Sequence, residues 1–174
     1  MRIGIAGPSC SGKSTLARLL AASLGAERLC LDDFYLSRHP RRYVESGGAR
    51  VRSFEHPQAY DGEALLRWVG GQDGPVVAEG FLLFLYPGSE AIFDRMIFVD
   101  LPWEEIVARR SARKGQNAAK VEASFSAIGR GEWELFGARQ RDLPGVTVID
   151  GRRPIGDLLT ECERVLAPVA SQPR

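Results

Sequence analysis

The chain has 174 residues, of which 44% are hydrophobic and 26% are charged. This length and composition suit one compact α/β domain and exclude a disordered or collagen-like chain. The 23 basic and 22 acidic residues leave a net charge of +1, so the chain carries no overall charge excess that would attract nucleic acid or an anionic membrane.

Cysteine usage and the N-terminus point to the cytoplasm. Cys10, Cys30 and Cys162 are odd in number and lack metal-type spacing, which is typical of reduced thiols. The first apolar stretch is broken too early, by Gly7 and Pro8, to be a signal peptide. Since no apolar run reaches the roughly 18 residues of a membrane span, we expect a soluble cytoplasmic protein.

Short apolar runs alternate with helical patterns, which predicts a mostly parallel five-stranded sheet with helices on both faces. Gly25 is expected to end the first helix, Asp61 to cap the second and Pro102 to begin the third. In chain order, we expect a strand at about 2–6, a helix at 13–23, a strand at 27–31, a helix from 61 to 69, strands at 75–79 and 95–100, a helix from 102, a strand at 146–150 and a helix at 154–166.

Two stretches fit neither pattern. Residues 37–54 are rich in arginine, and residues 114–131 are rich in glycine, alanine and serine. Long connections of this kind are either solvated loops or binding loops and lids. We interpret 37–60 as a loop that covers a phosphate acceptor and 109–131 as a mobile lid, both within a single domain, 1–174.

The string GPSCSGKS at Gly7–Ser14 has the spacing of a phosphate-binding loop, between an expected strand and an expected helix. Its glycines let backbone N–H groups turn inward, and the helix N-terminus adds a positive dipole. Lys13 is expected to reach the β- and γ-phosphates of ATP, and the Ser14 hydroxyl to bind Mg²⁺. The predicted nucleotide-binding residues are Gly7, Pro8, Ser9, Cys10, Ser11, Gly12, Lys13, Ser14 and Thr15.

Carboxylates follow two of the expected strands. Asp32 and Asp33 come after the second strand, and Glu79 ends the third. Ligands gather at the carboxyl ends of parallel strands, where one carboxylate can accept a proton from an attacking hydroxyl and another can hold Mg²⁺. We assign Asp32 to the site and Asp33 to the scaffold, although either aspartate can instead cap the segment that follows.

Five strings, in this order, resemble the uridine kinase and nicotinamide riboside kinase family of P-loop nucleoside kinases: GPSCSGKST, LDDFY, FEHPQAYD, VVAEGFLLF and RRSAR. The similarity spans nearly the whole chain. The DDF string and EGFLLF are closest to the riboside kinases, whereas the His-Pro pair is similar to uridine kinases. The later string GEWELFGARQ resembles the tryptophan-bearing region after the lid in the riboside kinases.

The resemblance implies roles for the acceptor side of the site. It makes Asp32 the base on the ribose 5′-hydroxyl, and Asp61 the carboxylate that binds the 2′- and 3′-hydroxyls, with Tyr60 as a wall. A carboxylate can accept hydrogen bonds from both hydroxyls of a diol, which agrees with this role for Asp61. Phe34 and His56 are implied as further acceptor-binding residues.

The resemblance also implies roles on the phosphate side. It places Glu79 near the magnesium ion and gives Arg109, Arg110 and Arg113 to the ATP phosphates as the lid closes. Arg109 and Arg113 are four residues apart on one expected helix face, so both can meet one polyphosphate, although Glu104 or Glu105 can pair with them instead.

The sequence departs from the uridine kinase pattern at Lys114, where those enzymes usually have an aspartate after the last lid arginine. The residues that surround a base are not recognisable, although the candidates to stack on one are Trp103, Trp133, Phe84 and Tyr86.

We therefore expect an ATP- and Mg²⁺-dependent kinase that phosphorylates the ribose 5′-hydroxyl of a nucleoside such as uridine, cytidine or nicotinamide riboside. The alternatives are a kinase of another small hydroxyl acceptor, such as pantothenate or a sugar, a nucleotide-dependent regulatory module, and a family member that binds ATP without transfer. The regulatory alternative is weakened because the chain has no Asn-Lys-x-Asp string and has Glu79 where switch GTPases have Asp-x-x-Gly.

Overall fold

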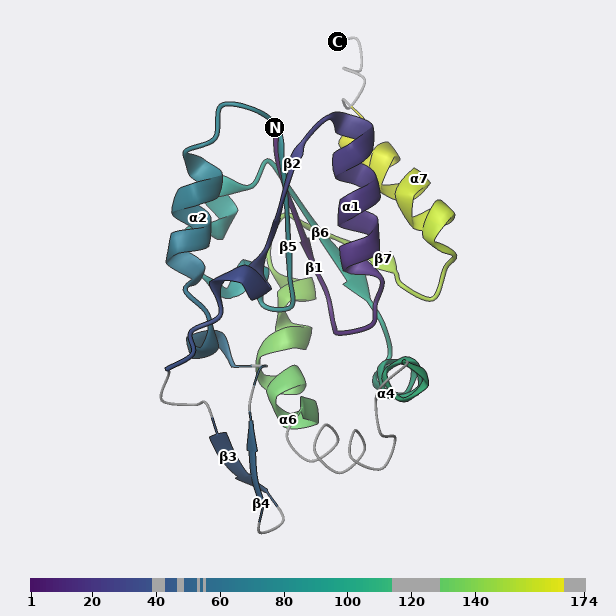
Figure 1. Ribbon diagram of the computed structural model, residues 1–174. Helices are drawn as coiled ribbons and strands as arrows, with labels where there is room; N and C mark the ends of the chain where they lie inside the picture. The colour runs from purple at the N-terminus through teal and green to yellow at the C-terminus, as the bar shows by residue number, and fades with distance from the viewer. Residues whose placement is uncertain (39–42, 47–48, 53, 55, 114–128, 168–174) are drawn as a thin grey trace.

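A five-stranded parallel sheet organises the computed structural model, which describes residues 1–38, 43–46, 49–52, 54, 56–113 and 129–167 (Figure 1). The strand order is β2-β5-β1-β6-β7, and every neighbouring pair is parallel. The expected strands are confirmed to within one residue at each end. They are β1 (Arg2–Ala6), β2 (Glu27–Cys30), β5 (Val76–Gly80), β6 (Arg95–Asp100) and β7 (Val146–Asp150).

The path of the chain reverses at the centre of this sheet. From β1 the chain runs outward to the edge strand β2, returns to β5 beside β1, and then crosses to β6 and β7 on the other side. Ligands of open parallel sheets bind at such a switch point, outside the carboxyl ends of the strands. The segment that leaves the carboxyl end of β1 is the predicted phosphate-binding loop.

Helices cover both faces of the sheet, as expected. On one face α1 (Lys13–Leu24) and α7 (Ile155–Leu166) lie side by side and form a core with Ile3 and Ile5 of β1 (Figure 1). Gly4 points to the opposite face, where a Cβ atom would lie 2.6 Å from the Phe84 ring. This close approach explains why glycine interrupts an otherwise apolar strand.

The second face holds the larger core and carries α2 (Gly62–Gly70), the short helix α3 (Ser89–Ile92) and 3₁₀ turns at Pro57–Ala59 and Leu83–Leu85. Asp61 caps α2 as predicted, and Gly25 ends α1 in the left-handed region at φ 59. The third expected helix is α4 (Trp103–Ala112), which begins directly after Pro102. A further 3₁₀ turn, η1 (Leu31–Phe34), follows β2.

One element was not expected from the sequence. Strands β3 (Tyr43–Ser46) and β4 (Ala49–Arg52) form an antiparallel hairpin inside the stretch that we interpreted as a loop, and the hairpin projects away from the main sheet (Figure 1). A backbone bridge between Tyr35 and Tyr60 joins the two segments that flank it. This bridge closes the base of the segment that carries the hairpin.

The predicted lid, 109–131, is described only at its two ends, because 114–128 lie outside the described residues. Its first residues end α4, and its last begin a run of three turns: α6 (Arg130–Glu132), a π-helical turn at Trp133–Gly137 and a 3₁₀ turn at Ala138–Asp142. The described helices include none that is long and apolar enough to cross a membrane.

Candidate active site

The loop between β1 and α1 has the backbone geometry that phosphate binding requires. Gly7 and Gly12 adopt positive φ angles of 150° and 92°, and Cys10 is a non-glycine residue in the left-handed region at φ 63°. At Gly7 a Cβ atom would lie 2.6 Å from the carbonyl oxygen of Val99, so only glycine fits. The loop thus curls tightly onto the N-terminus of a helix of 12 residues, where N–H groups and the helix dipole favour anions.

Lys13 and Ser14 stand at the first turn of α1. The Lys13 ammonium folds back over the loop and donates a hydrogen bond of 3.4 Å to the carbonyl oxygen of Pro8. The Ser14 hydroxyl donates to Glu79 Oε2 at 3.0 Å. Ser14 and Glu79, the two residues expected to hold Mg²⁺, are thus brought together from α1 and β5.

The Glu79 carboxylate is buried, with 1% of its surface exposed, at the end of β5. Its second oxygen, Oε1, accepts a hydrogen bond of 3.3 Å from Nη1 of Arg28 on β2. This ion pair balances a negative charge that would otherwise be expensive to bury. Arg28 was not predicted as part of the site, because its partner Glu79 is 51 residues away in the chain.

Two neighbouring cavities open around this loop. One, of about 530 Å³, is here called the loop cavity and is lined by Ser9, Cys10, Gly12, Lys13, Ser14, Thr15, Asp32, Arg109, Ala112 and Arg113. The other, of about 380 Å³, is called the aromatic cavity and is lined by Ser9, Lys13, Asp32, Tyr35, Phe54, Tyr60, Phe81 and Arg110. Ser9, Lys13 and Asp32 line both cavities and therefore mark their junction.

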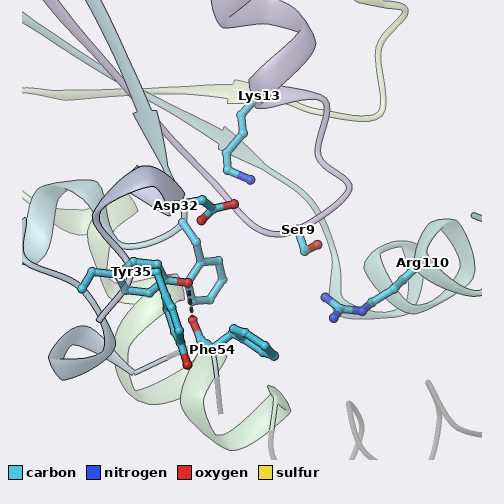
Figure 2. Close-up of a pocket in the computed structure, with 8 residues that line it drawn as sticks. Ser9, Lys13, Asp32, Tyr35, Phe54 and Arg110 are labelled. Atoms are coloured by element: carbon cyan, nitrogen blue, oxygen red, sulfur yellow. Dashed lines mark hydrogen bonds between the residues drawn. The ribbon is translucent and has the colours of Figure 1, made fainter. Parts of the chain in front are cut away.

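Asp32 is the carboxylate of the LDDFY string that reaches this junction. It lies in the turn η1, and its side chain is exposed. Figure 2 shows the Asp32 carboxylate and the Lys13 ammonium pointing into the same space, with Ser9 and Arg110 on the other side of it. The residue expected to act as a general base and the residue expected to bind phosphate thus face the same space.

Four aromatic side chains form the walls of the aromatic cavity. The Tyr35 ring lies 5.5 Å from the Phe54 ring and 5.6 Å from the Tyr60 ring, measured between centroids. The Tyr60 hydroxyl donates a hydrogen bond of 2.7 Å to the carbonyl oxygen of Phe54, drawn as a dashed line in Figure 2. Phe81, the first residue after β5, completes the wall. Such a set of rings suits a flat, unsaturated ligand.

The three arginines of the RRSAR string separate in the structure. Arg109 and Arg113 line the loop cavity, whereas Arg110 lines the aromatic cavity. Arg109 pairs with Glu105 at 2.8 Å, which was the alternative left open by the sequence. Its Nη1 also donates to the carbonyl oxygen of Gly151 at 3.0 Å and approaches that of Cys10 at 3.5 Å. Arg109 therefore connects α4 to the loop between β1 and α1 and to the turn after β7.

Asp61 has a structural role in addition to any contact with a ligand. Its Oδ1 accepts a hydrogen bond of 2.9 Å from the Ala64 N–H and so caps α2. Burial, followed by the nearby negative charge of Asp61, raises the pKa of Tyr86. The Asp61 side chain is thus half-buried at the start of a helix.

Two other predicted acceptor residues have partners elsewhere. The His56 Nδ1 accepts a hydrogen bond of 3.1 Å from the Gln58 N–H, and the imidazole packs edge-on against Phe136 at 5.0 Å. Phe34 packs against the larger core. Neither they nor Asp61 are among the described residues that line the aromatic cavity.

The aromatic wall was predicted only at Tyr60. Of the candidates for stacking on a base, Trp133, Phe84 and Tyr86 are buried in the larger core instead. Phe81 could have been found, because it directly follows a strand at the carboxyl edge of the sheet. Nothing local identifies Phe54, which reaches the cavity through its contacts with Tyr35 and Tyr60.

Comparison with known proteins agrees with this geometry, although no family model matches the chain. Nicotinamide riboside kinase 1 of Mus musculus is 32% identical in an alignment that covers 91% of this chain and 90% of that protein. The chain belongs to the uridine kinase and nicotinamide riboside kinase family. Nicotinamide riboside kinase 1 of Homo sapiens is 30% identical in an alignment that covers 64% of each protein. Uridine kinase-like protein 3 of Arabidopsis thaliana is 28% identical in an alignment that covers 77% of this chain but 36% of that protein.

The fold of this family member is also that of more distant kinases. A gluconokinase from Sinorhizobium meliloti 1021 superposes with a TM-score of 0.66 at 17% identity, over 97% of this chain and 93% of that one. At this identity the likeness concerns the P-loop α/β fold alone. The family consists of phosphotransferases that act on an alcohol group, and this gives the junction of the two cavities its chemical interpretation.

Proposed function

We propose that this kinase transfers the γ-phosphate of ATP to the ribose 5′-hydroxyl of a nucleoside. The observation that carries the proposal is the junction of the two cavities, where Lys13 and Asp32 line both. A phosphoryl transfer enzyme needs one compartment for the polyphosphate and one for the acceptor, with the reacting atoms at the boundary.

ATP would occupy the loop cavity. The backbone N–H groups of residues 9–14 and the N-terminus of α1 would hold the phosphate oxygens. Lys13 would leave its contact with the Pro8 carbonyl, which is long at 3.4 Å, to bind the β- and γ-phosphates. Arg113 lines the same cavity, and its positive charge can stabilise the negative charge that spreads over the transferred group in the transition state.

Ser14, which lines this cavity, and its hydrogen-bond partner Glu79 carry oxygen atoms that fit Mg²⁺. The hydroxyl of Ser14 and the carboxylate of Glu79 are hard oxygen ligands, already 3.0 Å apart, and Mg²⁺ prefers such ligands together with water and phosphate oxygens. Bound Mg²⁺ would neutralise charge on the β- and γ-phosphates. The Arg28 ion pair keeps the Glu79 side chain in place at the end of β5.

The acceptor would occupy the aromatic cavity with its hydroxyl at the junction. Asp32 would accept the proton of that hydroxyl as the oxygen attacks the γ-phosphorus and the bond to the β-phosphate oxygen breaks. Asp61 does not itself line the cavity but directly follows Tyr60, which does. Its half-buried carboxylate would bind the ribose 2′- and 3′-hydroxyls with the lone pairs that the Ala64 N–H does not use. Tyr60, the residue beside it, would form the wall behind the sugar.

The aromatic wall favours an acceptor with a flat base. A pyridinium ring is both flat and cationic, so the faces of Tyr35, Tyr60 and Phe81 would attract it beyond ordinary stacking. Among nucleosides we therefore place nicotinamide riboside first and uridine or cytidine second. The relatives include proteins named for each of these two activities.

An ADP-release assay with ATP, Mg²⁺ and a panel of nicotinamide riboside, uridine, cytidine and pantothenate tests the proposal. We expect acceptor-dependent ADP release with a nucleoside. The Asp32→Ala variant should lose at least about 100-fold in kcat while it retains ATP binding, because a positioned base contributes this much. Asp33→Ala is the matched control and should keep the activity. Turnover with pantothenate alone, or undiminished turnover by Asp32→Ala, would contradict the proposal.

A further inference from the structure

Gln140 is a fully buried polar side chain outside the residues that line either cavity. Its amide nitrogen donates to the carbonyl oxygens of Phe81, at 2.7 Å, and Gly137, at 3.3 Å. Its amide oxygen accepts from the Phe84 N–H at 2.9 Å. One side chain thus satisfies backbone groups of the turn that follows β5, where the ladder of the sheet has ended.

Phe81 is held by the same segment at two points. Gln140 binds its backbone oxygen, and the Trp133 ring packs against its own ring, with the centroids 5.8 Å apart. Trp133 is in turn stacked on Phe98 at 6.2 Å. Because Phe81 is a wall of the aromatic cavity, the position of that wall depends on the turns at 130–142.

The local structure of these turns allows the close packing of Trp133 against Phe81. A Cβ atom at Gly137 would lie 2.1 Å from Cε3 of Trp133 and 2.9 Å from Cζ of Phe81, so the close approach requires glycine. The π-helical turn at Trp133–Gly137 carries both the tryptophan and this glycine. Widened turns of this kind are costly in isolation and are frequent at functional sites.

The same turns also reach the other side of the cavity. The Phe136 ring contacts His56 edge-on at 5.0 Å, and His56 begins the 3₁₀ turn that leads to Tyr60. The turns at 130–142 therefore touch two segments that supply walls of the aromatic cavity, one through Phe81 and one through His56.

We propose that Gln140 is a positioning residue for the phosphate acceptor, which acts by fixing Phe81 at the wall of the aromatic cavity. The inference rests on the proposed function, because it takes this cavity as the acceptor site. Gln140 contacts no residue of the phosphate-binding loop through its three hydrogen bonds. Its loss should therefore weaken acceptor binding and leave ATP binding intact.

The test uses Gln140→Met, which keeps the length of the side chain and removes its hydrogen bonds. With nicotinamide riboside or uridine as acceptor, we expect the acceptor KM to rise at least about 5-fold, with the KM for ATP changed less than 2-fold. Leu158→Ala is the control for lost stability, since Leu158 is buried in the core on the opposite face, in α7. It should lower the melting temperature without changing either KM.

A double-mutant cycle with Phe81→Leu separates this role from general stabilisation. If Gln140 acts through Phe81, adding Gln140→Met to Phe81→Leu should raise the acceptor KM by less than 2-fold further. Fold-changes that multiply independently would overturn the inference, as would an equal rise in acceptor KM in Leu158→Ala. If Gln140→Met does not fold, Gln140→Asn replaces it and should give the same pattern.

The wild-type protein separates this inference from the proposed function. Wild-type protein without turnover on any nucleoside contradicts both proposals. Wild-type turnover with an unchanged acceptor KM in Gln140→Met contradicts the role of Gln140 alone.

Discussion

The role of Asp61 as the cap of α2 and its proposed role in binding the ribose diol can be measured separately. Its Oδ1 accepts a hydrogen bond of 2.9 Å from the Ala64 N–H at the start of α2, a helix of nine residues. Removing such a cap costs about 1 kcal/mol. For a chain of this size, that loss lowers the melting temperature by about 2–4 °C. Asparagine caps helices as well as aspartate does, so Asp61→Asn should keep the stability that Asp61→Ala loses.

The functional role predicts a different ranking of the same two variants. A neutral amide has one acceptor oxygen and no charge, so it binds a ribose diol more weakly than a carboxylate does. Both Asp61→Asn and Asp61→Ala should therefore raise the acceptor KM by about 10-fold or more, with little change in the KM for ATP. Urea unfolding and steady-state kinetics on the same preparations measure both properties. A wild-type acceptor KM in Asp61→Asn would refute diol binding, and equal destabilisation of both variants would refute the cap.

Three further predictions concern charges and thiols. Arg28→Met should lower the free energy of unfolding, measured in urea, by about 2 kcal/mol. This is less than the loss expected for a fully buried ion pair, because Arg28 is 42% exposed although Glu79 is buried. A loss below about 0.5 kcal/mol would contradict this role of the ion pair. Hydrogen bonds from Arg152 lower the pKa of Asp150 to about 2, so this pair stabilises the folded protein above pH 3.8 and loses that effect as the pH falls toward 2. Arg152→Ala should return the pKa of Asp150 toward 3.8 in an NMR titration. An unchanged pKa in this variant would count against the pair. Burial raises the pKa of Cys30 to about 12, so its thiol should not react with Ellman's reagent at pH 8 until the chain unfolds, and rapid labelling in the folded state would exclude this environment.

Much of the scaffold could be predicted because its elements carry strong local patterns. Most of the strands are short apolar runs, and two helices have a clear end signal, the cap at Asp61 for α2 and Gly25 after α1. The hairpin β3–β4 and the turns at 130–142 could not be predicted in this way. The hairpin lies in an arginine-rich stretch, and the π-helical turn at Trp133–Gly137 depends on the packing of Trp133 against Phe81.

The same difference between local patterns and tertiary packing decides which parts of the site could be predicted. The phosphate-binding loop was predictable because its conformation is local and depends on glycines at Gly7 and Gly12. The placement of Asp32 beside this loop was predictable from its position at a strand end. The aromatic wall was largely missed, because Tyr35 and Phe54 are adjacent only in the folded chain. The partner of Glu79 was also missed, since Arg28 reaches it across the sheet.

The position of the transferred phosphate tests the kinase assignment most directly. The protein would be incubated with ATP, Mg²⁺ and nicotinamide riboside, with uridine in a parallel reaction, and followed by ³¹P NMR. We predict equal amounts of ADP and a nucleoside 5′-monophosphate, with neither formed by Lys13→Met. Inorganic phosphate formed at the same rate without acceptor, or a phosphomonoester at another hydroxyl, would contradict the transfer that we propose at the junction of Lys13 and Asp32.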